Sequence, residues 1–202
     1  MFKNIDSRSV TTKNVKHYVN ERNIYPPYPK NTKTLVVGMG CFWGAERVFY
    51  EFQGVYVTAA GYAGGTIEYP SYEDVCTGKT NHAEVVKVVF ECDKVSIQDL
   101  LRVFFESHDP TQKNRQGNDI GTQYRSLLIL NTLEELQIAR SIGLKYQAEL
   151  DKNNLKKITT EYLIDLPFYY AEDYHQQYLA KNPSGYCGLK GTGVTCPTSY
   201  DN

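Results

Sequence analysis

Gly38-Met39-Gly40-Cys41-Phe42-Trp43-Gly44-Ala45-Glu46 is the stretch that joins the first expected strand to the first expected helix. The apolar run at 35–37 before it is typical of a buried strand. The apolar residues after it recur at three- and four-residue steps, as one face of a helix requires: Phe42, Ala45, Phe49 and Phe52. Gly38 and Gly40 would let the backbone turn sharply between the two elements. We therefore expect Cys41 at about the first residue of the helix.

Cys41 is the first candidate for chemistry because of this position. The first N–H groups of a helix have no backbone partner and carry partial positive charge. A thiol placed there is shifted toward the thiolate, which is the nucleophilic form. The alternative is a buried and inert cysteine on a core helix, which is common in proteins.

The composition of the chain narrows its class. It has 202 residues, with 22 Lys and Arg against 23 Asp and Glu, for a net charge of -1. This balance argues against nucleic acid or an anionic membrane as the main partner. No apolar run approaches the ~20 residues of a membrane span. The N-terminus has no hydrophobic signal core, and Asp6 and Glu21 do not suit a transit peptide. We expect a cytoplasmic protein, with an organelle as the alternative.

The cysteines favour reactive thiols over structural ones. They are five in number and widely spaced: Cys41, Cys76, Cys92, Cys187 and Cys196. An odd and scattered set is a poor disulfide framework. The sequence has no Cys-x-x-Cys pair and no zinc-like spacing of cysteine and histidine. We expect no metal and no cofactor.

The order of expected elements predicts the fold class. Strands are expected at 35–39, 55–62, 83–91, 126–130 and 155–164, the last at a sheet edge. Helices are expected at 41–53, 96–107 and 132–150, with a short one at about 172–181. This is the split βαβ, ferredoxin-like plan with an added helix and strand. We predict an α+β two-layer sandwich with a mixed sheet and a coiled, Gly-rich C-terminal tail.

The chain is expected to form one domain with an arm. Residues 1–33 are polar and contain closely spaced prolines, which suit an extended arm packed on the body. Residues 34–202 would form a single catalytic domain that includes a redox tail from about 183. The connections at 66–81 and 108–125 are long and irregular, as binding loops often are.

Glu84 is the second candidate for chemistry. It begins the expected strand 83–91, on the same face as Val86, Val88 and Phe90, whereas Lys87 and Glu91 mark a wetter face. A carboxyl group on a buried face has a raised pKa, which suits a general acid near neutral pH. The alternative is a glutamate at a strand end that reaches out to solvent.

Two cysteines in the tail suggest a relay of oxidation. Four glycines surround Cys187 and Cys196, so this segment could carry a thiol to more than one place. A nucleophilic thiol that becomes oxidised can be reduced by a second thiol, and exchange then passes the disulfide outward. The alternative is a disulfide that only staples the tail, which a reducing compartment disfavours.

Several motifs resemble one known family. Gly-Cys-Phe-Trp-Gly-Ala-Glu at 40–46 is similar to the signature of the peptide methionine sulfoxide reductase A family. Further similar motifs follow in order: Tyr-Pro-Ser-Tyr-Glu at 69–73, His-Ala-Glu at 82–84, His-Asp-Pro-Thr at 108–111, Gly-Asn-Asp-Ile-Gly-Thr-Gln-Tyr-Arg-Ser at 117–126 and Ala-Glu-Asp-Tyr-His-Gln-Gln-Tyr-Leu at 171–179. The resemblance covers about Leu35 to Pro197.

The resemblance implies roles for residues of the site. Cys41 would attack the sulfoxide sulfur, and Glu84 would give a proton to the sulfoxide oxygen. Tyr72 and Tyr124 would form hydrogen bonds to that oxygen, although ordinary packing is the alternative for two among 17 tyrosines. Asp119 would support the polar network. Phe42 and Trp43 would enclose the S-methyl group of the substrate.

The resemblance also implies how the enzyme is regenerated. Cys187 matches the resolving cysteine and Cys196 the recycling one, with thioredoxin as the reductant. The substrate would be methionine S-sulfoxide, free or in oxidised proteins, and the enzyme a monomer. We expect Cys76 to pack within its loop, Cys92 to be incidental and His175 to be a structural support.

Three other readings stay open at this point. A peroxidase of the peroxiredoxin type also needs a reactive and a resolving cysteine, but no acid on a buried strand beside Phe-Trp. A binding module could recognise oxidised methionine, or a partner, through the aromatic pocket without chemistry. A zinc-bound structural domain has little support from the spacing of ligands.

Overall fold

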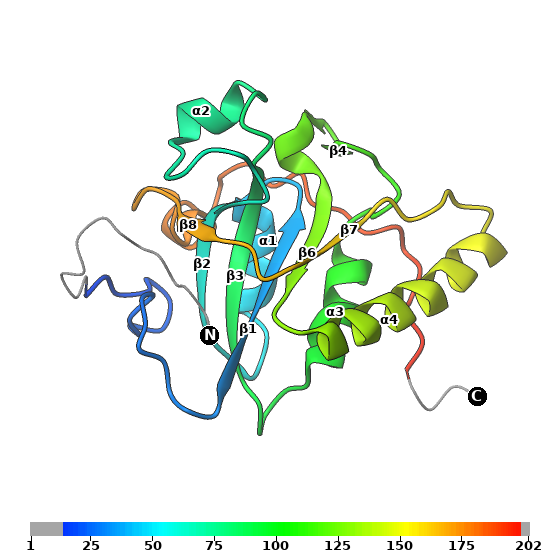
Figure 1. Cartoon of the computed structure of the whole chain (residues 1–202), viewed down its shortest axis with the longest axis horizontal. Coiled ribbons are helices and arrows are strands. Elements are labelled where there is room, and N and C mark those ends of the chain that lie inside the picture. Colours follow the sequence, from blue (N-terminus) through cyan, green and yellow to red (C-terminus); the bar gives the residue numbers. More distant parts are fainter. Residues whose placement is uncertain (1–13, 199–202) are drawn as a thin grey trace.

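The computed structural model describes residues 14–198, which fold into one mixed sheet with helices on one of its faces (Figure 1). The strands of the sheet are β1 Thr32–Met39, β2 Val55–Ala63, β3 Ala83–Glu91, β6 Ser126–Leu130, β7 Glu161–Ile164 and β8 Phe168–Tyr170. Their order is β7-β6-β1-β3-β2-β8, and only the pair β6–β7 is parallel among these neighbours. The fold is therefore α+β with a mixed sheet.

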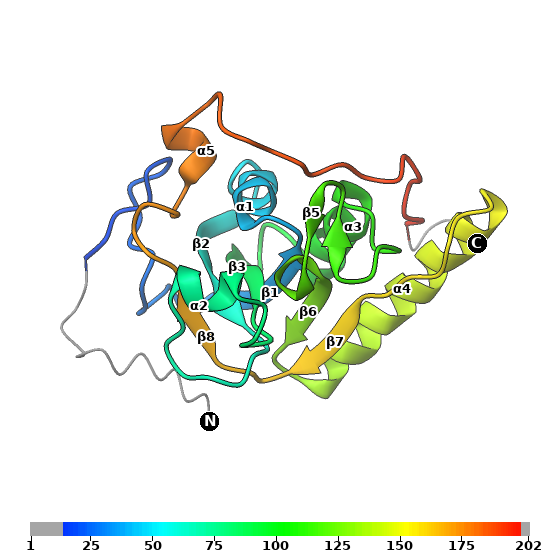
Figure 2. The ribbon, with the colours of Figure 1, turned by 90° about the horizontal axis from the view of Figure 1, so that it is seen from above.

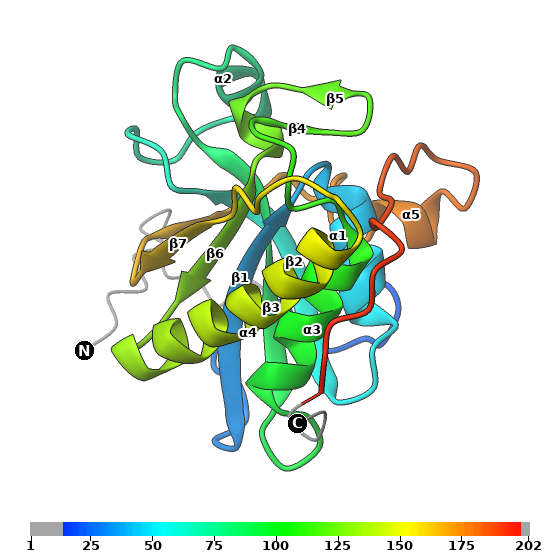
Figure 3. The same cartoon turned by 90° about the vertical axis from the view of Figure 1, so that its right-hand side faces the viewer.

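The helices are α1 Phe42–Tyr50, α2 Tyr72–Cys76, α3 Ile97–Ser107, α4 Leu133–Lys152 and α5 Tyr178–Lys181. A short hairpin of β4 Arg115–Gln116 and β5 Asp119–Ile120 leads to a 3₁₀ turn at Thr122–Tyr124. Figure 3 shows α4 lying across the sheet next to α3. Between residues 14 and 198, the helices are all too short or too polar to cross a bilayer.

The main core lies between the helices and one face of the sheet. On β3, Val86, Val88 and Phe90 are at most 1% exposed and belong to this core, as their alternation predicts. The apolar stripe of α3 packs against them and includes Phe104 and Phe105. Full burial of each of these side chains contributes roughly 1.5–3 kcal/mol. The alternation of side chains along β3 therefore places Glu84 on the same face of the sheet as the main core.

The second face of the sheet is covered too, so the expected wetter face is wrong. Lys87 is only 7% exposed, and its ammonium group lies 4.2 Å from the centre of the Phe168 ring. It also donates to the hydroxyl group of Tyr170 at 3.1 Å. Residues of the N-terminal arm, Ile24 and Tyr25, join the apolar cluster on this side. A lysine tolerates this burial because its long stem is apolar and its charge faces aromatic rings and a hydroxyl group.

Helix starts follow the local capping signals. Ser96 caps α3 with a reciprocal bond to Asp99, and the helix spans the expected residues. At α4 only half of a capping box forms, because Thr132 accepts from the Glu135 N–H while the Glu135 carboxylate accepts from the Asn131 N–H. A capping side chain satisfies an N–H group that the helix itself leaves unpaired.

Several expected boundaries are corrected by long-range pairing. The loop at 66–81 contains α2, whose capping box is Ser71 with Asp74. The last expected strand shortens to β7, because β6 pairs with only four of its residues. Segment 168–170, for which no strand was expected, is β8 and pairs with β2. The helices α1 and α5 are shorter than expected, ending at Tyr50 and beginning at Tyr178.

The turn before α1 rests on Gly40, whereas Gly38 serves a different purpose. Gly40 has φ +93°, and a methyl group there would lie 2.6 Å from Cβ of Gln116. Gly38 lies within β1, where a methyl group would stand 3.2 Å from the carbonyl oxygen of Arg125. Gly38 therefore permits close strand packing and does not make the turn, contrary to expectation.

Replacing Gly40 with alanine is expected to lower the free energy of unfolding by about 1–3 kcal/mol, because the left-handed backbone and the clash with Gln116 act together. Gly78→Ala is the matched control, since Gly78 has φ +70° with nothing within 4 Å of the added methyl group. Urea unfolding should show the larger loss for Gly40→Ala. Equal losses would mean that the contact with Gln116 is unimportant.

Candidate active site

The site is built at the point where β1 ends and α1 begins. Cys41 is the N-cap residue of α1, as its sequence position predicts. Glu84, the second residue of β3, accepts a hydrogen bond from the backbone N–H of Phe42 at 3.0 Å through Oε2. The carboxyl group thus accepts from one of the N–H groups that have no backbone partner at the start of the helix. Glu84 lies beside Cys41 because neighbouring strands present both residues at the same edge.

Glu84 is a buried acid. Its side chain is 2% exposed, so the alternative of a glutamate reaching into solvent is wrong. Burial raises the pKa of Glu84 to about 8, with a smaller contribution from the charge of Asp119, while the Phe42 N–H opposes the rise. At neutral pH the group therefore holds a proton that it can give away.

The thiol of Cys41 does not behave as its helix position suggests. Burial raises the pKa of Cys41 well above its usual range, and the charge of Glu84 raises it further. The N–H groups of Trp43 and Gly44 lower it, as expected at a helix start, but burial outweighs them. The expected shift toward the thiolate is therefore present but is outweighed by burial in the substrate-free site. Both Cys41 and Glu84 hold their protons there at neutral pH.

Two phenol groups and a second carboxylate complete the polar side of the site. Tyr72 begins α2, Tyr124 ends the 3₁₀ turn, and Asp119 lies on β5. Burial raises the pKa values of Tyr72 and Tyr124, and the charge of Glu84 raises both further. The charge of Cys41 also acts on Tyr124. Side chains from five separate segments of the chain therefore lie close enough for their charges to affect one another's pKa values.

The apolar side of the site is an aromatic cluster around His175. The indole N–H of Trp43 donates to Nδ1 of His175 at 3.1 Å, and its rings stack on Tyr178 with centroids 3.8 Å apart. The ring centroids of Phe42 and Tyr72 lie 4.9 and 4.6 Å from that of His175. His175 therefore orients Trp43, which agrees with the expected role as a structural support.

Two residues of this region were missed from the sequence. Tyr178 stacks on Trp43, and Glu172 accepts hydrogen bonds from the Tyr72 backbone at 3.0 Å and from the Tyr62 hydroxyl group at 2.8 Å. Glu172 thereby ties α2 to the sheet. The only signal for either was its place in the motif at 171–179, since both roles depend on contacts far along the chain.

The first tail cysteine lies against α1. A methyl group at Gly44 would be 3.0 Å from Sγ of Cys187, and Nη2 of Arg47 donates to that sulfur at 3.2 Å. Residues 41, 44 and 47 are three apart and so lie on one face of the helix. Cys187 is therefore about one helical turn from Cys41. Figure 2 shows the tail after α5 passing over α1.

The second tail cysteine is held elsewhere. Cys196 is 2% exposed and belongs to the main core beside α3 and α4. Its backbone N–H donates to Oε1 of Glu106 at 2.6 Å, and burial raises the pKa of its thiol to about 11. The structure therefore does not bring Cys196 together with Cys187. Cys76 and Cys92 are exposed, and Cys76 ends α2 where packing within a loop was expected.

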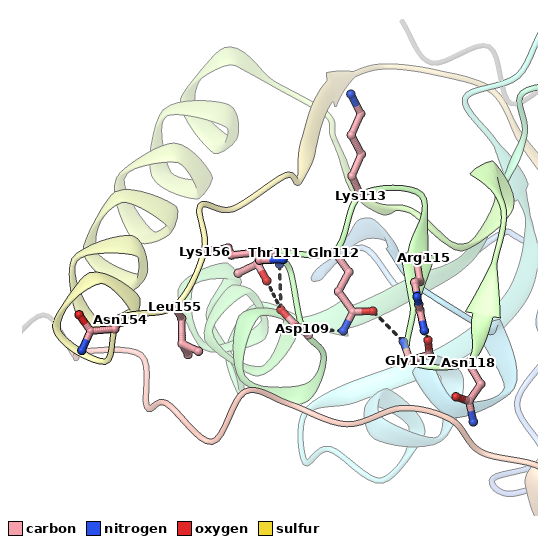
Figure 4. A pocket seen from close by; sticks show the side chains of 10 residues that line it. All are labelled: Asp109, Thr111, Gln112, Lys113, Arg115, Gly117, Asn118, Asn154, Leu155 and Lys156. Carbon is pink, nitrogen blue, oxygen red and sulfur yellow. Dashed lines mark hydrogen bonds between the residues drawn. The ribbon is translucent and has the colours of Figure 1, made fainter.

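A separate groove of about 800 Å³ lies between the β4–β5 hairpin and the segment after α4 (Figure 4). Its lining includes three cationic side chains, Lys113, Arg115 and Lys156. The residues predicted to form the site do not line this groove. Over residues 14–198, no three histidine, cysteine or acidic side chains gather in a way that could hold a metal ion.

Comparison with known proteins agrees with this arrangement. The sequence profile of the peptide methionine sulfoxide reductase family matches residues 33–195. The chain belongs to this family. It is 57% identical over 181 residues to peptide methionine sulfoxide reductase MsrA of Methylococcus capsulatus, covering 90% of this chain and 82% of that one. The human mitochondrial peptide methionine sulfoxide reductase is 53% identical, with 90% and 77% covered.

A solved structure of the family gives the same fold. Methionine sulfoxide reductase A of Corynebacterium diphtheriae aligns with a TM-score of 0.79 and 43% identity. The alignment covers 90% of this chain and 89% of the other. The family fold therefore extends over nearly all the described residues.

Proposed function

We propose that this protein reduces methionine S-sulfoxide, free or within oxidised proteins, to methionine. The observation that carries the proposal is the hydrogen bond from the Phe42 N–H to the buried, protonated Glu84. It sets a proton donor beside the thiol of Cys41. Membership of the reductase family supports the same conclusion. A peroxidase would not need this acid next to an aromatic wall.

The substrate has a polar S–O group beside an apolar methyl group, so its site needs apolar walls and directed donors. The sulfur of Cys41 bonds to the sulfoxide sulfur while Glu84 gives its proton to the oxygen. The thiol proton of Cys41 passes to Glu84. The hydroxyl group then moves from the substrate sulfur to the sulfur of Cys41, the bond between the two sulfurs breaks, and methionine leaves with Cys41 as a sulfenic acid.

The remaining groups act on the same atoms. Tyr72 and Tyr124 donate hydrogen bonds to the oxygen as charge builds on it, much as an oxyanion hole does. Asp119 steadies the polar network and accepts a hydrogen bond from Tyr186 at 3.2 Å. Phe42 and Trp43 enclose the methyl group and exclude water.

Regeneration uses the tail. The thiol of Cys187 attacks the sulfenic sulfur of Cys41, forming a disulfide and releasing water. The thiol of Cys196 exchanges into this bond and frees Cys41, and thioredoxin reduces the disulfide that results. Because Cys196 is buried beside α3 and α4, the tail must leave that position before exchange.

Replacing Cys196 with serine should spare a single turnover and slow repeated turnover with thioredoxin, because only the exchange step is lost. Rapid quench measurement of methionine would give one equivalent at the unaltered rate. Steady-state measurement would give the slower recycling. Equal steady-state rates would show that Cys187 alone passes the disulfide outward.

The order of the strands supports the ferredoxin-like arrangement that the sequence predicts. We infer that β6, β1, β3 and β2 with α1 and α3 form a ferredoxin-like core, since these four strands are antiparallel neighbours in that order. The helix α4 and strand β7 extend this core, within one catalytic domain from residue 34. The redox tail begins at about 183.

This thiol chemistry suits a monomer in the cytoplasm, where thiols are kept reduced.

The test is turnover of the two purified sulfoxide epimers with thioredoxin, thioredoxin reductase and NADPH present. We expect reduction of the S epimer and no reduction of the R epimer. Peroxide turnover without sulfoxide reduction would support a peroxidase. Tight binding of the S epimer without formation of methionine would support a binding module.

A further inference from the structure

Glu46, which the chemistry above does not use, is a fully buried carboxyl group on α1. Its oxygens accept three hydrogen bonds: Oε1 from Thr58 Oγ1 at 2.9 Å and Gln177 Nε2 at 2.7 Å, and Oε2 from the Gln177 backbone N–H at 2.7 Å. A buried carboxyl group is unfavourable unless such donors surround it. These donors come from β2 and from the turn that starts α5.

The direction of these bonds extends the network into the N-terminal arm. The hydroxyl proton of Thr58 points to Glu46, so its oxygen accepts from Nε2 of His17 at 2.9 Å. The other ring nitrogen of His17 accepts from the backbone N–H of Val19 at 3.3 Å. One donor and one acceptor make a neutral imidazole, and burial lowers the pKa of His17 to about 4. His17 is therefore a fixed donor to Thr58.

The arm reaches the same turn by a second route. The backbone N–H of Tyr18 donates to Oε1 of Gln177 at 3.1 Å. Gln177 has φ +47° and ψ +42°, a left-handed conformation that is uncommon for a residue other than glycine. Such a conformation persists when its surroundings hold it. Glu46 accepts from the side-chain Nε2 and from the backbone N–H of Gln177, and the Tyr18 N–H donates to the side-chain oxygen.

This turn places both partners of Trp43. His175, two residues before Gln177, accepts from the indole N–H, and Tyr178, the next residue, stacks on the indole rings. Trp43 and Glu46 are three residues apart on α1 and so lie on one side of it. The helix therefore holds the 175–178 turn through two side chains.

We propose that Glu46 is a positioning residue that, through Thr58 and His17, couples the N-terminal arm to the orientation of Trp43 in the substrate pocket. His17 lies in the N-terminal arm, before residue 33, where the match to the family profile begins. The inference rests on the proposed function for its substrate, but the placement of Trp43 can be measured without turnover.

Thr58→Val tests the proposal because valine keeps the size of threonine and removes the link between His17 and Glu46. We expect KM for methionine S-sulfoxide to rise about tenfold, the factor that corresponds to the loss of one buried hydrogen bond, with a smaller change in kcat. Trp43 is the single tryptophan of the chain, so its fluorescence reports on the pocket directly. Acrylamide should quench that fluorescence more strongly in the variant.

Thr34→Val is the matched control, because the Thr34 hydroxyl group contacts Asn131, away from this network. It should leave KM and quenching unchanged. His17→Ala, which keeps both Thr58 and Glu46, should reproduce the shifts and serves if Thr58→Val does not fold.

Unchanged KM and unchanged quenching in folded Thr58→Val and His17→Ala proteins would overturn the proposal. Failure of the proposed function would instead appear as no sulfoxide turnover by the unaltered protein. In that case the quenching of Trp43 still decides whether Glu46 and the arm position the indole ring.

Discussion

Cys41→Ser protein is expected to lose methionine sulfoxide reduction by on the order of 10⁴-fold or more, as when an enzyme loses its nucleophile. A serine hydroxyl group is a poor nucleophile at this position and can form neither a sulfenic acid nor a disulfide. The N-cap geometry should survive, because Cys41 makes no capping hydrogen bond through its side chain. Methionine release from the S epimer, measured with dithiothreitol as reductant, checks this result without thioredoxin.

Cys92→Ser is the matched control for this prediction. Cys92 is an exposed thiol that follows the end of β3 opposite to Glu84, so its loss should leave turnover unchanged. If the Cys41→Ser variant still reduced the sulfoxide, Cys41 would not be the nucleophile. If the variant still bound the sulfoxide but formed no methionine, the result would agree with the assignment of Cys41 as the nucleophile.

Glu84→Gln is expected to reduce the single-turnover rate by ~10²–10⁴-fold, the range for a general acid. Glutamine fills the same space and its oxygen can still accept from the Phe42 N–H, but it has no acidic proton. In the unaltered protein the rate should fall as pH rises through about 8, where Glu84 loses its proton. The variant should lack this decline.

Stability should report the same titration. Because the folded pKa of Glu84 is raised from 4.5 to about 8, its favourable contribution is full below pH 4.5 and is lost as pH rises to about 8. Urea unfolding at pH 5 and pH 8 should show this loss in the unaltered protein and a smaller one in Glu84→Gln. Glu91→Gln, at the other end of β3, is the control and should keep both the rate and the pH profile. An unchanged pH profile in Glu84→Gln would reject the assignment of the acid.

The sequence predicted those parts of the fold that depend on local patterns. The period of two over 83–91 gave the bounds of β3 and the face of Glu84, and Ser96 gave the start of α3. The short helix α2 was missed, although Ser71 and Asp74 form a capping box that is visible in the sequence. The strand β8 could not be found because three residues carry little periodic signal.

Properties set by distant contacts were not predictable. The burial of Lys87 depends on Phe168 and Tyr170, which lie 81 and 83 residues away along the chain. The pKa of Cys41 is dominated by burial, which a position at a helix start does not reveal. The place of Cys196 beside α3 and α4 likewise follows from tertiary packing.

The central claim is that Cys41 takes the oxygen of the sulfoxide. The most direct measurement uses Cys187→Ser protein, in which the oxidised thiol cannot be resolved by its neighbour. After one addition of methionine S-sulfoxide, the protein is labelled with dimedone and mapped by mass spectrometry. The account predicts one equivalent of methionine and one dimedone adduct on Cys41. Methionine formed with the adduct on Cys76, Cys92 or Cys196, or with no adduct, would contradict it.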